Sequence, residues 1–369
     1  MEGDRGPSPK AGPRVAILAE GRFARATAKT AIGVLRYAPY PVVAVIDSTR
    51  AGTDAWQHIG GRPGEDPALP VVASVAEAVE RGAEVILIGT ASAGGRIADA
   101  DRPFLADALR RGLAVWNGLH ERVLADPALA AAARAGRGAV RELREPPGDL
   151  PVGGHRRPRA GVTVVLTVGS DAAVGKMTVA LEIAAALRRA GRTAAFVATG
   201  QTGIAIAGDG IAVDAVVADF IAGAAERMVC DAAEGSDWVL VEGQGSLAHP
   251  GFSGVTTGLL HGSAPDLMVL CHDASRHETK GYPTLPLRPL DELVRIHEEA
   301  ARWSRPPDAP RAKVAAVALN TSGLDDRDAA RAIFDAAALT GLPAADPIRE
   351  GAGGADRLAR ALLDAGPSA

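Results

Sequence analysis

Short apolar runs alternate with amphipathic stretches along most of the chain. An apolar run bounded by polar or glycine-containing segments is typical of a buried parallel strand, and a period of 3.6 residues between such runs indicates a crossover helix. In the first part of the chain this pattern predicts strands at 14–19, 42–46, 85–88 and 113–116, and helices at 74–81 and 104–111. The alternation predicts a Rossmann-like domain with a parallel sheet.

The same alternation restarts after a segment rich in proline, glycine and arginine. The second part has predicted strands at 162–168, 194–198, 238–241, 267–271 and 314–319, with a helix at 178–190. We therefore expect a second parallel α/β domain, of the P-loop NTPase-like kind. The predicted divisions are a disordered tail (1–13), an N-terminal domain (14–143), a linker (144–160) and a C-terminal domain (161–369).

Composition narrows the choice of ligands and partners. A chain of 369 residues with 47% apolar residues suits two packed domains, and a net charge of −4 gives no general attraction for nucleic acid or anionic membranes. The two cysteines, Cys230 and Cys271, lack the spacing of a metal site, so we expect no metal there. Neither a signal peptide nor a membrane-spanning run is evident, which predicts a cytoplasmic protein without nucleic-acid or membrane partners. A homo-oligomer is compatible with the sequence.

The strongest local motif is a phosphate-binding loop between the strand at 162–168 and the helix at 178–190. Backbone N–H groups of residues 171–176 can surround a phosphate, the helix N-terminus adds a partial positive charge, and Lys176 adds a full one. The residues predicted to bind a cofactor here are Gly169, Ser170, Asp171, Ala172, Ala173, Val174, Gly175, Lys176, Met177 and Thr178. The alternative is a glycine-containing turn with a surface lysine.

Two departures from the usual P-loop pattern bear on the chemistry. Ser170 stands where the pattern has its first glycine, and Met177 stands where a serine or threonine normally binds magnesium. A thioether is no ligand for magnesium, and Thr178 lies about 100° further round the helix, which suits another phosphate oxygen better. The motif therefore predicts binding of nucleotide or coenzyme phosphates and puts ordinary magnesium-dependent hydrolysis in doubt.

Polar residues follow the neighbouring strands of the second domain, where the crevice of such a sheet lies. Glu242 could hold a metal, orient a water, accept a proton from an amine, or merely cap a loop. His249 is a candidate general base because imidazole titrates near neutral pH, although a loop histidine is more often structural. Further substrate-binding candidates in this domain are Gln201, Thr202, Asp214, Asp219 and Gln244, of which the two aspartates could equally be helix-cap or surface residues.

Four further candidates could bind an adenine ring or a substrate carboxylate. Asn320 suits recognition of an adenine edge, although an Asx-turn explains it almost as well. In the first domain Arg22, Lys29 and Arg36 could meet a substrate carboxylate across a domain cleft, or they could line a solvated helix face. The loop after the first strand has a single glycine, so dinucleotide binding there is unsupported.

Several of these segments together resemble one family. They are Ala19-Glu-Gly, Ala28-Lys-Thr-Ala, Arg36-Tyr-Ala-Pro, Val45-Ile-Asp-Ser, Trp116-Asn-Gly-Leu-His, Ser170-Asp-Ala-Ala-Val-Gly-Lys-Met-Thr, Val213-Asp-Ala-Val-Val-Ala-Asp-Phe and Val241-Glu-Gly-Gln-Gly-Ser-Leu. From about residue 14 to 363 the chain resembles the DgcN-like family of D-glutamate N-acetyltransferases, long catalogued as a domain of unknown function. The family's P-loop domain is similar to that of dethiobiotin synthetase.

The resemblance implies transfer of acetyl from acetyl-CoA to the amine of an acidic D-amino acid, with the N-terminal domain completing the site. Met177 fits this activity, because coenzyme A needs phosphate contacts but no phosphoryl transfer. Glu242 or His249 would then deprotonate the amine, and loop N–H groups or Gln244 would stabilise the oxyanion.

Two rival functions remain open at this stage. One is an ATP-dependent ligase or kinase that uses ATP with magnesium to activate a carboxylate, as dethiobiotin synthetase-like enzymes do. The other is a non-catalytic nucleotide sensor. The stretch 271–283 is more polar than the proposed chemistry requires, which leaves the identity and stereochemistry of the acceptor open.

Overall fold

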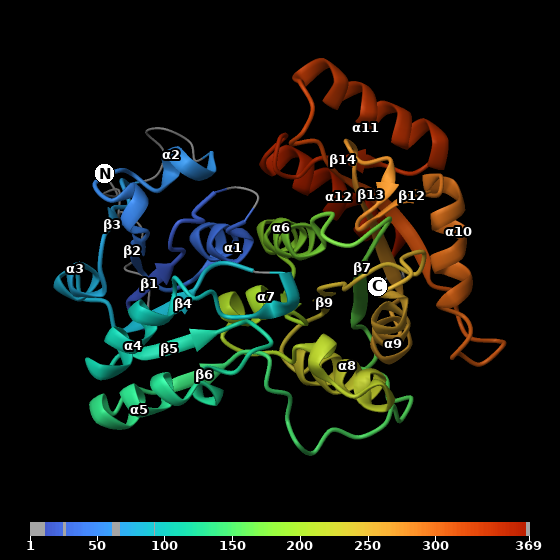
Figure 1. Cartoon of the computed structure of the whole chain (residues 1–369). Helices are drawn as coiled ribbons and strands as arrows, with labels where there is room; N and C mark the ends of the chain where they lie inside the picture. Colours follow the sequence, from blue (N-terminus) through green and yellow to red (C-terminus); the bar gives the residue numbers. More distant parts are fainter. Residues whose placement is uncertain (1–11, 25–26, 61–66, 92, 367–369) are drawn as a thin grey trace, which may run out of the picture. The chain divides into compact units, whose positions relative to one another are not determined.

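The computed structural model describes residues 12–24, 27–60, 67–91 and 93–366. The chain divides into two compact units (Figure 1): unit 1 comprises 1–145 with 204–209, and unit 2 comprises 146–203 with 210–369. Most of the predicted tail, residues 1–11, lies outside the described part of the chain. The predicted domain limits stay a prediction; the division by contacts falls after residue 145.

Unit 1 is built on a parallel sheet of order β3-β2-β1-β4-β5-β6. Its strands are β1 (Val15–Leu18), β2 (Val42–Ile46), β3 (Val71–Val72), β4 (Val85–Ile88), β5 (Ala114–Asn117) and β6 (Val140–Glu142). Its helices are α1 (Lys29–Tyr37), α2 (Trp56–Ile59), α3 (Val75–Glu80), α4 (Arg102–Arg110) and α5 (Pro127–Gly136). The four predicted strands are confirmed, whereas β3 and β6 were missed because two or three residues show no periodicity.

A later segment of the chain also belongs to unit 1. Residues 204–209 include the last turn of α7 (Gln201–Ala207). The Tyr40 hydroxyl donates a hydrogen bond to the Ala205 carbonyl at 2.7 Å, and Arg141 donates to the Gly208 carbonyl at 2.6 Å. These two bonds join the segment to β-sheet and loop residues of unit 1.

Unit 2 is built on a second parallel sheet, of order β14-β13-β10-β7-β9-β8, with a separate hairpin of β11 and β12. Its strands are β7 (Thr163–Gly169), β8 (Ala194–Val197), β9 (Trp238–Val241), β10 (Leu267–Asp273), β11 (Glu278–Thr279), β12 (Tyr282–Pro286), β13 (Lys313–Asn320) and β14 (Ala344–Ala345). Its other helices are α6 (Lys176–Arg189), α8 (Ala218–Ala233), α9 (Ser253–Ser263), α10 (Leu290–Ala300), α11 (Asp326–Thr340) and α12 (Ala352–Ala365). The prediction of two parallel α/β sheets is confirmed.

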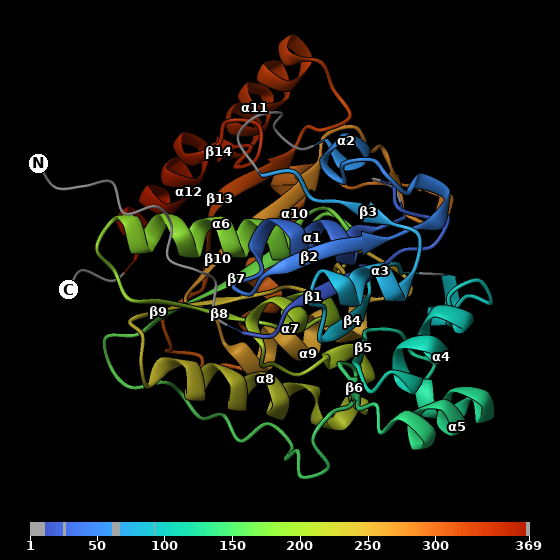
Figure 2. The same ribbon diagram turned by 90° about the vertical axis from the view of Figure 1, so that its left-hand side faces the viewer.

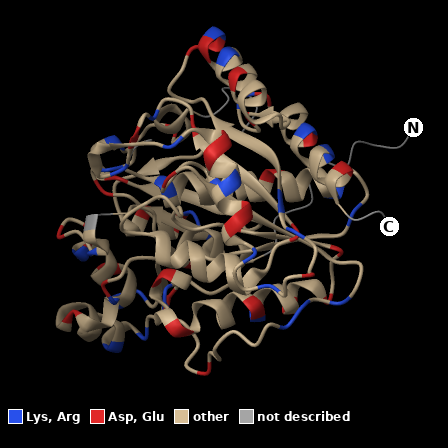
Figure 3. Ribbon diagram, turned by 90° about the vertical axis from the view of Figure 1, so that its right-hand side faces the viewer, with Lys and Arg blue, Asp and Glu red and all other residues tan. Residues whose placement is uncertain are grey.

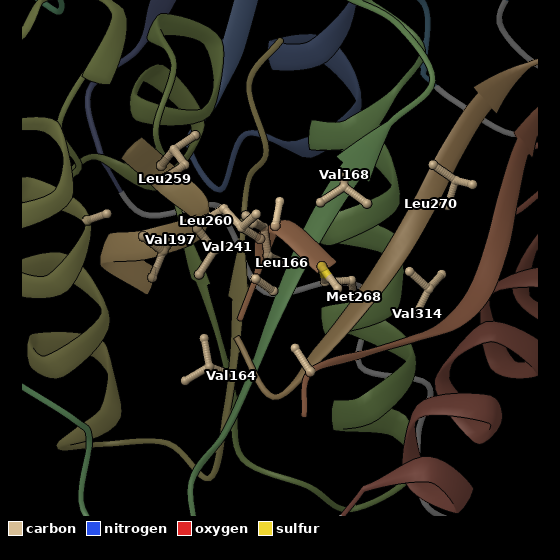
Figure 4. Close-up of a cluster of buried hydrophobic side chains, with 14 of the residues drawn as sticks. Val164, Leu166, Val168, Val197, Val241, Leu259, Leu260, Met268, Leu270 and Val314 are labelled. Atoms are coloured by element: carbon tan, nitrogen blue, oxygen red, sulfur yellow. The ribbon is translucent and has the colours of Figure 1, made fainter. Parts of the chain in front are cut away.

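Helices cover both faces of the unit 2 sheet, as Figure 2 shows for α6 and α12 on one face and α8 and α9 on the other. Successive side chains of β7 point to opposite faces of the sheet. Because helices cover both faces, every residue of this central strand is buried. Val164, Leu166 and Val168 pack with side chains of β9, β10 and α9 (Figure 4). Packing on both faces holds β7 in place, and the phosphate loop begins at the end of this strand.

The segment predicted to be a linker is bound along unit 2 rather than free. Glu226 on α8 accepts hydrogen bonds from the backbone N–H groups of Gly154 and Arg156 at 2.9 and 3.0 Å, and from Arg156 Nε at 2.7 Å. A Cβ on Gly223 would lie 1.9 Å from the Pro151 carbonyl oxygen, so only glycine allows the segment to approach α8 so closely. Residues 150–157 are thus part of the folded unit.

The outer helices α10 and α11 carry both signs of charge, which Figure 3 shows on this side of the molecule. Arg295 pairs with Asp291 on α10, and Arg331 pairs with Asp335 on α11. Pairs four residues apart are the usual stabilisation of a solvated helix face. Among the described residues, no helix combines the length and apolar character needed to cross a bilayer.

Candidate phosphate-binding and catalytic site

The phosphate loop joins the buried end of β7 to the first turn of α6. Ala173 and Gly175 adopt left-handed backbone conformations, with φ of 57° and 107°, which turn the chain into the helix. Within the described part of the chain, no side chain caps the N-terminus of α6. Because the first N–H groups of a helix have no partner within it, they are available to an anion here.

Lys176 is buried in the loop. Its Nζ donates hydrogen bonds to the carbonyl of Asp171 at 2.8 Å and to that of Gly245 at 2.7 Å. Burial lowers the pKa of Lys176 to about 8, so the ammonium is poorly compensated and an anion beside it would stabilise its charge. A Cβ on Gly169 would lie 2.8 Å from this Nζ and 2.9 Å from the Asp171 carbonyl oxygen, which explains why glycine stands at 169.

Asp171 ties the phosphate loop to the segment between β10 and β12. One oxygen of its buried carboxylate accepts from the Ala172 N–H at 2.7 Å, and the other accepts from the Lys280 N–H at 2.8 Å and Arg276 Nη1 at 2.7 Å. Its negative charge is therefore compensated inside the protein. Sequence reasoning did not select Arg276 or Lys280; the only signal was the unexplained polarity of 271–283.

The remaining predicted residues of the loop lie around this centre. The Ser170 hydroxyl lies 2.9 Å from His272 Nδ1, and burial lowers the pKa of His272 to about 4, so this imidazole is neutral. Met177 and Thr178 lie half-buried on the first turn of α6, whereas Ala173 is exposed at the tip of the loop.

Glu242 follows β9 directly and is buried. Its Oε2 accepts hydrogen bonds from the N–H groups of Thr199 and Gly200 at 2.9 and 3.1 Å, and its Oε1 accepts none from the part of the chain that the structure describes. Burial raises the pKa of Glu242 to about 7, and the charge of Asp214 adds to this, while the two N–H groups and Lys176 oppose it. The carboxyl therefore titrates near neutrality with one oxygen open to a ligand, as a general base requires.

Glycines of the segment after β8 make room for this carboxylate. A Cβ on Gly203 would lie 2.4 Å from Glu242 Oε2, and one on Gly200 would lie 2.5 Å from Gln244 Nε2. Gln244 Nε2 donates to Thr199 Oγ1 at 3.3 Å, and this hydroxyl donates to the Glu242 carbonyl at 2.7 Å. Thr199 begins the polar segment expected at the crevice after the strand at 194–198, but the sequence did not mark it as a site residue.

His249 occupies a different environment. Its Nδ1 accepts from the Gly251 N–H at 3.0 Å, which leaves the proton on Nε2, 3.2 Å from the Lys280 carbonyl. The ring stacks on Phe252 with centroids 4.4 Å apart and meets Tyr282 edge-on at 5.4 Å. Both ring nitrogens are engaged, so the geometry favours Glu242 over His249 as the base; the role of His249 stays a prediction.

The other candidates are distributed as follows. Gln201 and Thr202 begin α7, Asp214 lies close enough to Glu242 to act on its pKa, and Asp219 is exposed in the first turn of α8. Asn320 ends β13, two strands from β7, and its Oδ1 accepts from the Ser322 N–H at 3.1 Å, which is the Asx-turn alternative. The structure thus gathers the phosphate loop, Glu242 and Gln244 at one edge of the sheet.

The candidates of the N-terminal domain all lie in unit 1. Arg22 Nη2 donates to Asp101 Oδ2 at 2.6 Å. Lys29 is the first residue of α1 and Arg36 lies in its last turn, so these two side chains start from opposite ends of the helix. A single carboxylate would not meet both.

Comparison with known proteins identifies both parts of the chain. Residues 151–359 match the domain of unknown function described as the DUF1611_C P-loop domain, and residues 48–146 match the DUF1611_N Rossmann-like domain. A D-glutamate N-acetyltransferase of Tritonibacter scottomollicae is 38% identical over 75% of this chain and 81% of its own, and one of Pseudoalteromonas sp. is 34% identical over 75% and 82%. The crystal structure of a DUF1611 family protein from Anabaena variabilis superposes with a TM-score of 0.85 at 38% identity, covering 96% of this chain and 100% of its own.

Proposed function

The chain belongs to the DUF1611 family, and on this premise we propose that it is an N-acetyltransferase that moves acetyl from acetyl-CoA to the amine of an acidic D-amino acid such as D-glutamate. The observation that carries the proposal is Glu242, a buried carboxyl with a pKa of about 7 and one open oxygen beside a phosphate-binding loop. Both curated relatives are named D-glutamate N-acetyltransferase, which supports D-glutamate as the acceptor and acetyl as the transferred group. Use of acetyl-CoA and of a small amino acid fits a cytoplasmic enzyme.

The donor is held through its phosphates. Residues 169–178 supply backbone N–H groups and the ammonium of Lys176, and the amide nitrogen of Asn320 is left for an adenine edge because its oxygen is engaged in the Asx-turn. Met177 supplies no oxygen for magnesium, which suits a site that binds a phosphorylated coenzyme without transferring a phosphoryl group.

The acceptor is deprotonated by Glu242. Oε1 takes a proton from the ammonium, the amine nitrogen attacks the thioester carbonyl carbon, and the carbon–sulfur bond breaks to release coenzyme A, whose thiolate takes up a proton. Gln244 Nε2, which lies beside Thr199, is the side-chain donor we assign to the oxyanion of the tetrahedral intermediate. Gln201, Thr202, Asp214 and Asp219 are the proposed acceptor contacts in unit 2.

The test is to incubate the purified protein with acetyl-CoA and either D- or L-glutamate, and to follow free thiol and N-acetylglutamate. Stoichiometric release of both products with the D-isomer supports the proposal. Formation of ADP that depends on magnesium, ATP and an added carboxylic acid, without thiol release from acetyl-CoA, would replace it with the ligase alternative. Binding of ATP or acetyl-CoA without any turnover would favour the sensor.

A further inference from the structure

The carboxyl edge of the unit 1 sheet holds two buried polar groups with incomplete hydrogen bonding. Asp101 precedes α4 but does not cap it; its side chain is 0% exposed, and its Oδ2 accepts from Arg22. Its Oδ1, and the Oγ1 of Thr90, are buried and have no hydrogen-bond partner among the described residues. Leaving a buried polar atom without a hydrogen-bond partner lowers the stability of the fold by about 1–3 kcal/mol. We therefore expect a bound group to supply the missing hydrogen bonds.

Both groups lie where an open α/β sheet binds ligands. The strand order reverses between β1 and β4, and Thr90 follows β4 while Arg22 follows β1. Loops that leave neighbouring strands in opposite directions open a crevice at this point. The first turn of α1 lies at the same edge, since the Ala31 N–H donates a hydrogen bond to the carbonyl of Gly89, next to Thr90, at 2.9 Å.

The charges of this edge define a class of ligand. Arg22 is the exposed member of its ion pair, with 28% of its side chain accessible, and the rest of its guanidinium makes no hydrogen bond within the described ranges. The guanidinium of Arg22 suits a carboxylate. The Oδ1 of Asp101, on the carboxylate that pairs with Arg22, suits an ammonium. An α-amino acid carries both a carboxylate and an ammonium.

We propose that Arg22, Asp101 and Thr90 form an α-amino-acid site in unit 1, in which Arg22 binds the carboxylate and Asp101 and Thr90 bind the ammonium. Burial raises the pKa of Asp101 to about 6, and a second cation beside it would stabilise the carboxylate as Arg22 does. The inference concerns binding within unit 1, and it rests on the proposed function only for the choice of glutamate as the first probe.

Calorimetric titration of the full chain tests the site. The probes are D-glutamate, L-glutamate, glutarate, which lacks the ammonium, and 4-aminobutyrate, which lacks the α-carboxylate. We expect one glutamate isomer to bind at least about tenfold more tightly than either analogue, since each analogue leaves one buried or charged group unpaired. Asp101→Asn and Thr90→Val are expected to weaken that binding at least about tenfold.

A control variant tests whether any nearby carboxylate would have the same effect. Asp99→Asn removes a fully exposed carboxylate two residues away and should leave affinity unchanged. If Thr90 and Asp101 are only structural, Thr90→Val will keep or raise the melting temperature without changing affinity. Equal binding by wild type and both site variants, or no amino-acid binding at all, would overturn the site. Glutamate binding without acetyl transfer would instead overturn the proposed function and leave the site standing.

Discussion

Replacing Glu242 with glutamine is expected to separate activity from stability. Glutamine keeps an oxygen for the Thr199 and Gly200 N–H groups, but it cannot take a proton from an ammonium. Loss of a general base lowers kcat by about 10²- to 10⁴-fold, while the KM for acetyl-CoA should stay near that of wild type. The same substitution removes a carboxyl that burial holds at a pKa of about 7.

The stability effect follows from proton linkage. Glu242 has its pKa raised from 4.5 to about 7, so the folded protein binds this proton more tightly than the unfolded chain. Below pH 4.5 the carboxyl is protonated in both the folded and the unfolded state, so it does not lower the free energy of unfolding. As the pH rises from 4.5 to above 7, the free energy of unfolding falls by up to about 3 kcal/mol, at about 1.4 kcal/mol for each pH unit between the two pKa values. Glu242→Gln should therefore be more stable than wild type at pH 8 and similar to it at pH 4.5.

The assay pairs urea unfolding at pH 4.5 and 8 with kcat measured from pH 5.5 to 8.5. Wild-type kcat should fall about tenfold for each pH unit below 7, because the base is then protonated, and the variant should lack this acid limb. Glu234→Gln, at an exposed position after α8, is the matched control and should change neither quantity. A variant with near-normal kcat and the same acid limb would clear Glu242 of the role of base, and unchanged stability at pH 8 would contradict its raised pKa.

The remaining predictions concern the phosphate loop and its surroundings. Lys176→Ala should weaken acetyl-CoA binding about 10- to 100-fold, which corresponds to the loss of one hydrogen bond from a charged group, and should leave the circular dichroism spectrum unchanged. Unchanged affinity in the titration would show that the loop does not bind the coenzyme. Arg276→Met leaves the Asp171 carboxylate buried without its ion pair and should lower the free energy of unfolding by about 3–5 kcal/mol, and a denaturation midpoint equal to wild type would refute the pairing. Gly203→Ala places a Cβ 2.4 Å from the catalytic carboxylate and should lower kcat, whereas Gly254→Ala, with open space around its Cβ, should leave kinetics as they are; equal rates for both would count against the geometry.

Local pattern was enough to predict the main strands and the phosphate loop. The strands at 42–46, 85–88 and 238–241 are confirmed to the residue, because an unbroken apolar run between polar segments leaves few other conformations. β14 has two residues, and a run so short carries no periodicity to detect. The sequence does not indicate the bound course of 150–157, because a segment rich in proline and glycine has the composition of a linker whether or not it is docked.

The candidate site was predicted in its parts and not in its arrangement. Glu242 was selected because it follows a strand, but its raised pKa depends on burial and on the N–H groups of Thr199 and Gly200, more than 40 residues away in the chain. Asp171 was predicted as a phosphate-loop residue, and its pairing with Arg276 spans 105 positions. No local pattern reports a contact between such distant residues.

By itself, the sequence determined two parallel α/β sheets, the phosphate loop after β7 and the absence of a magnesium-binding hydroxyl at Met177. These properties are set by residues within one turn or one strand of each other, so they can be read locally. The tertiary structure decided which carboxylate has an open oxygen, why glycine stands at 169, and that residues 204–209 belong to unit 1. Burial, pKa and hydrogen-bond partners depend on the path of the whole chain, because the groups that determine them come from separate strands and loops.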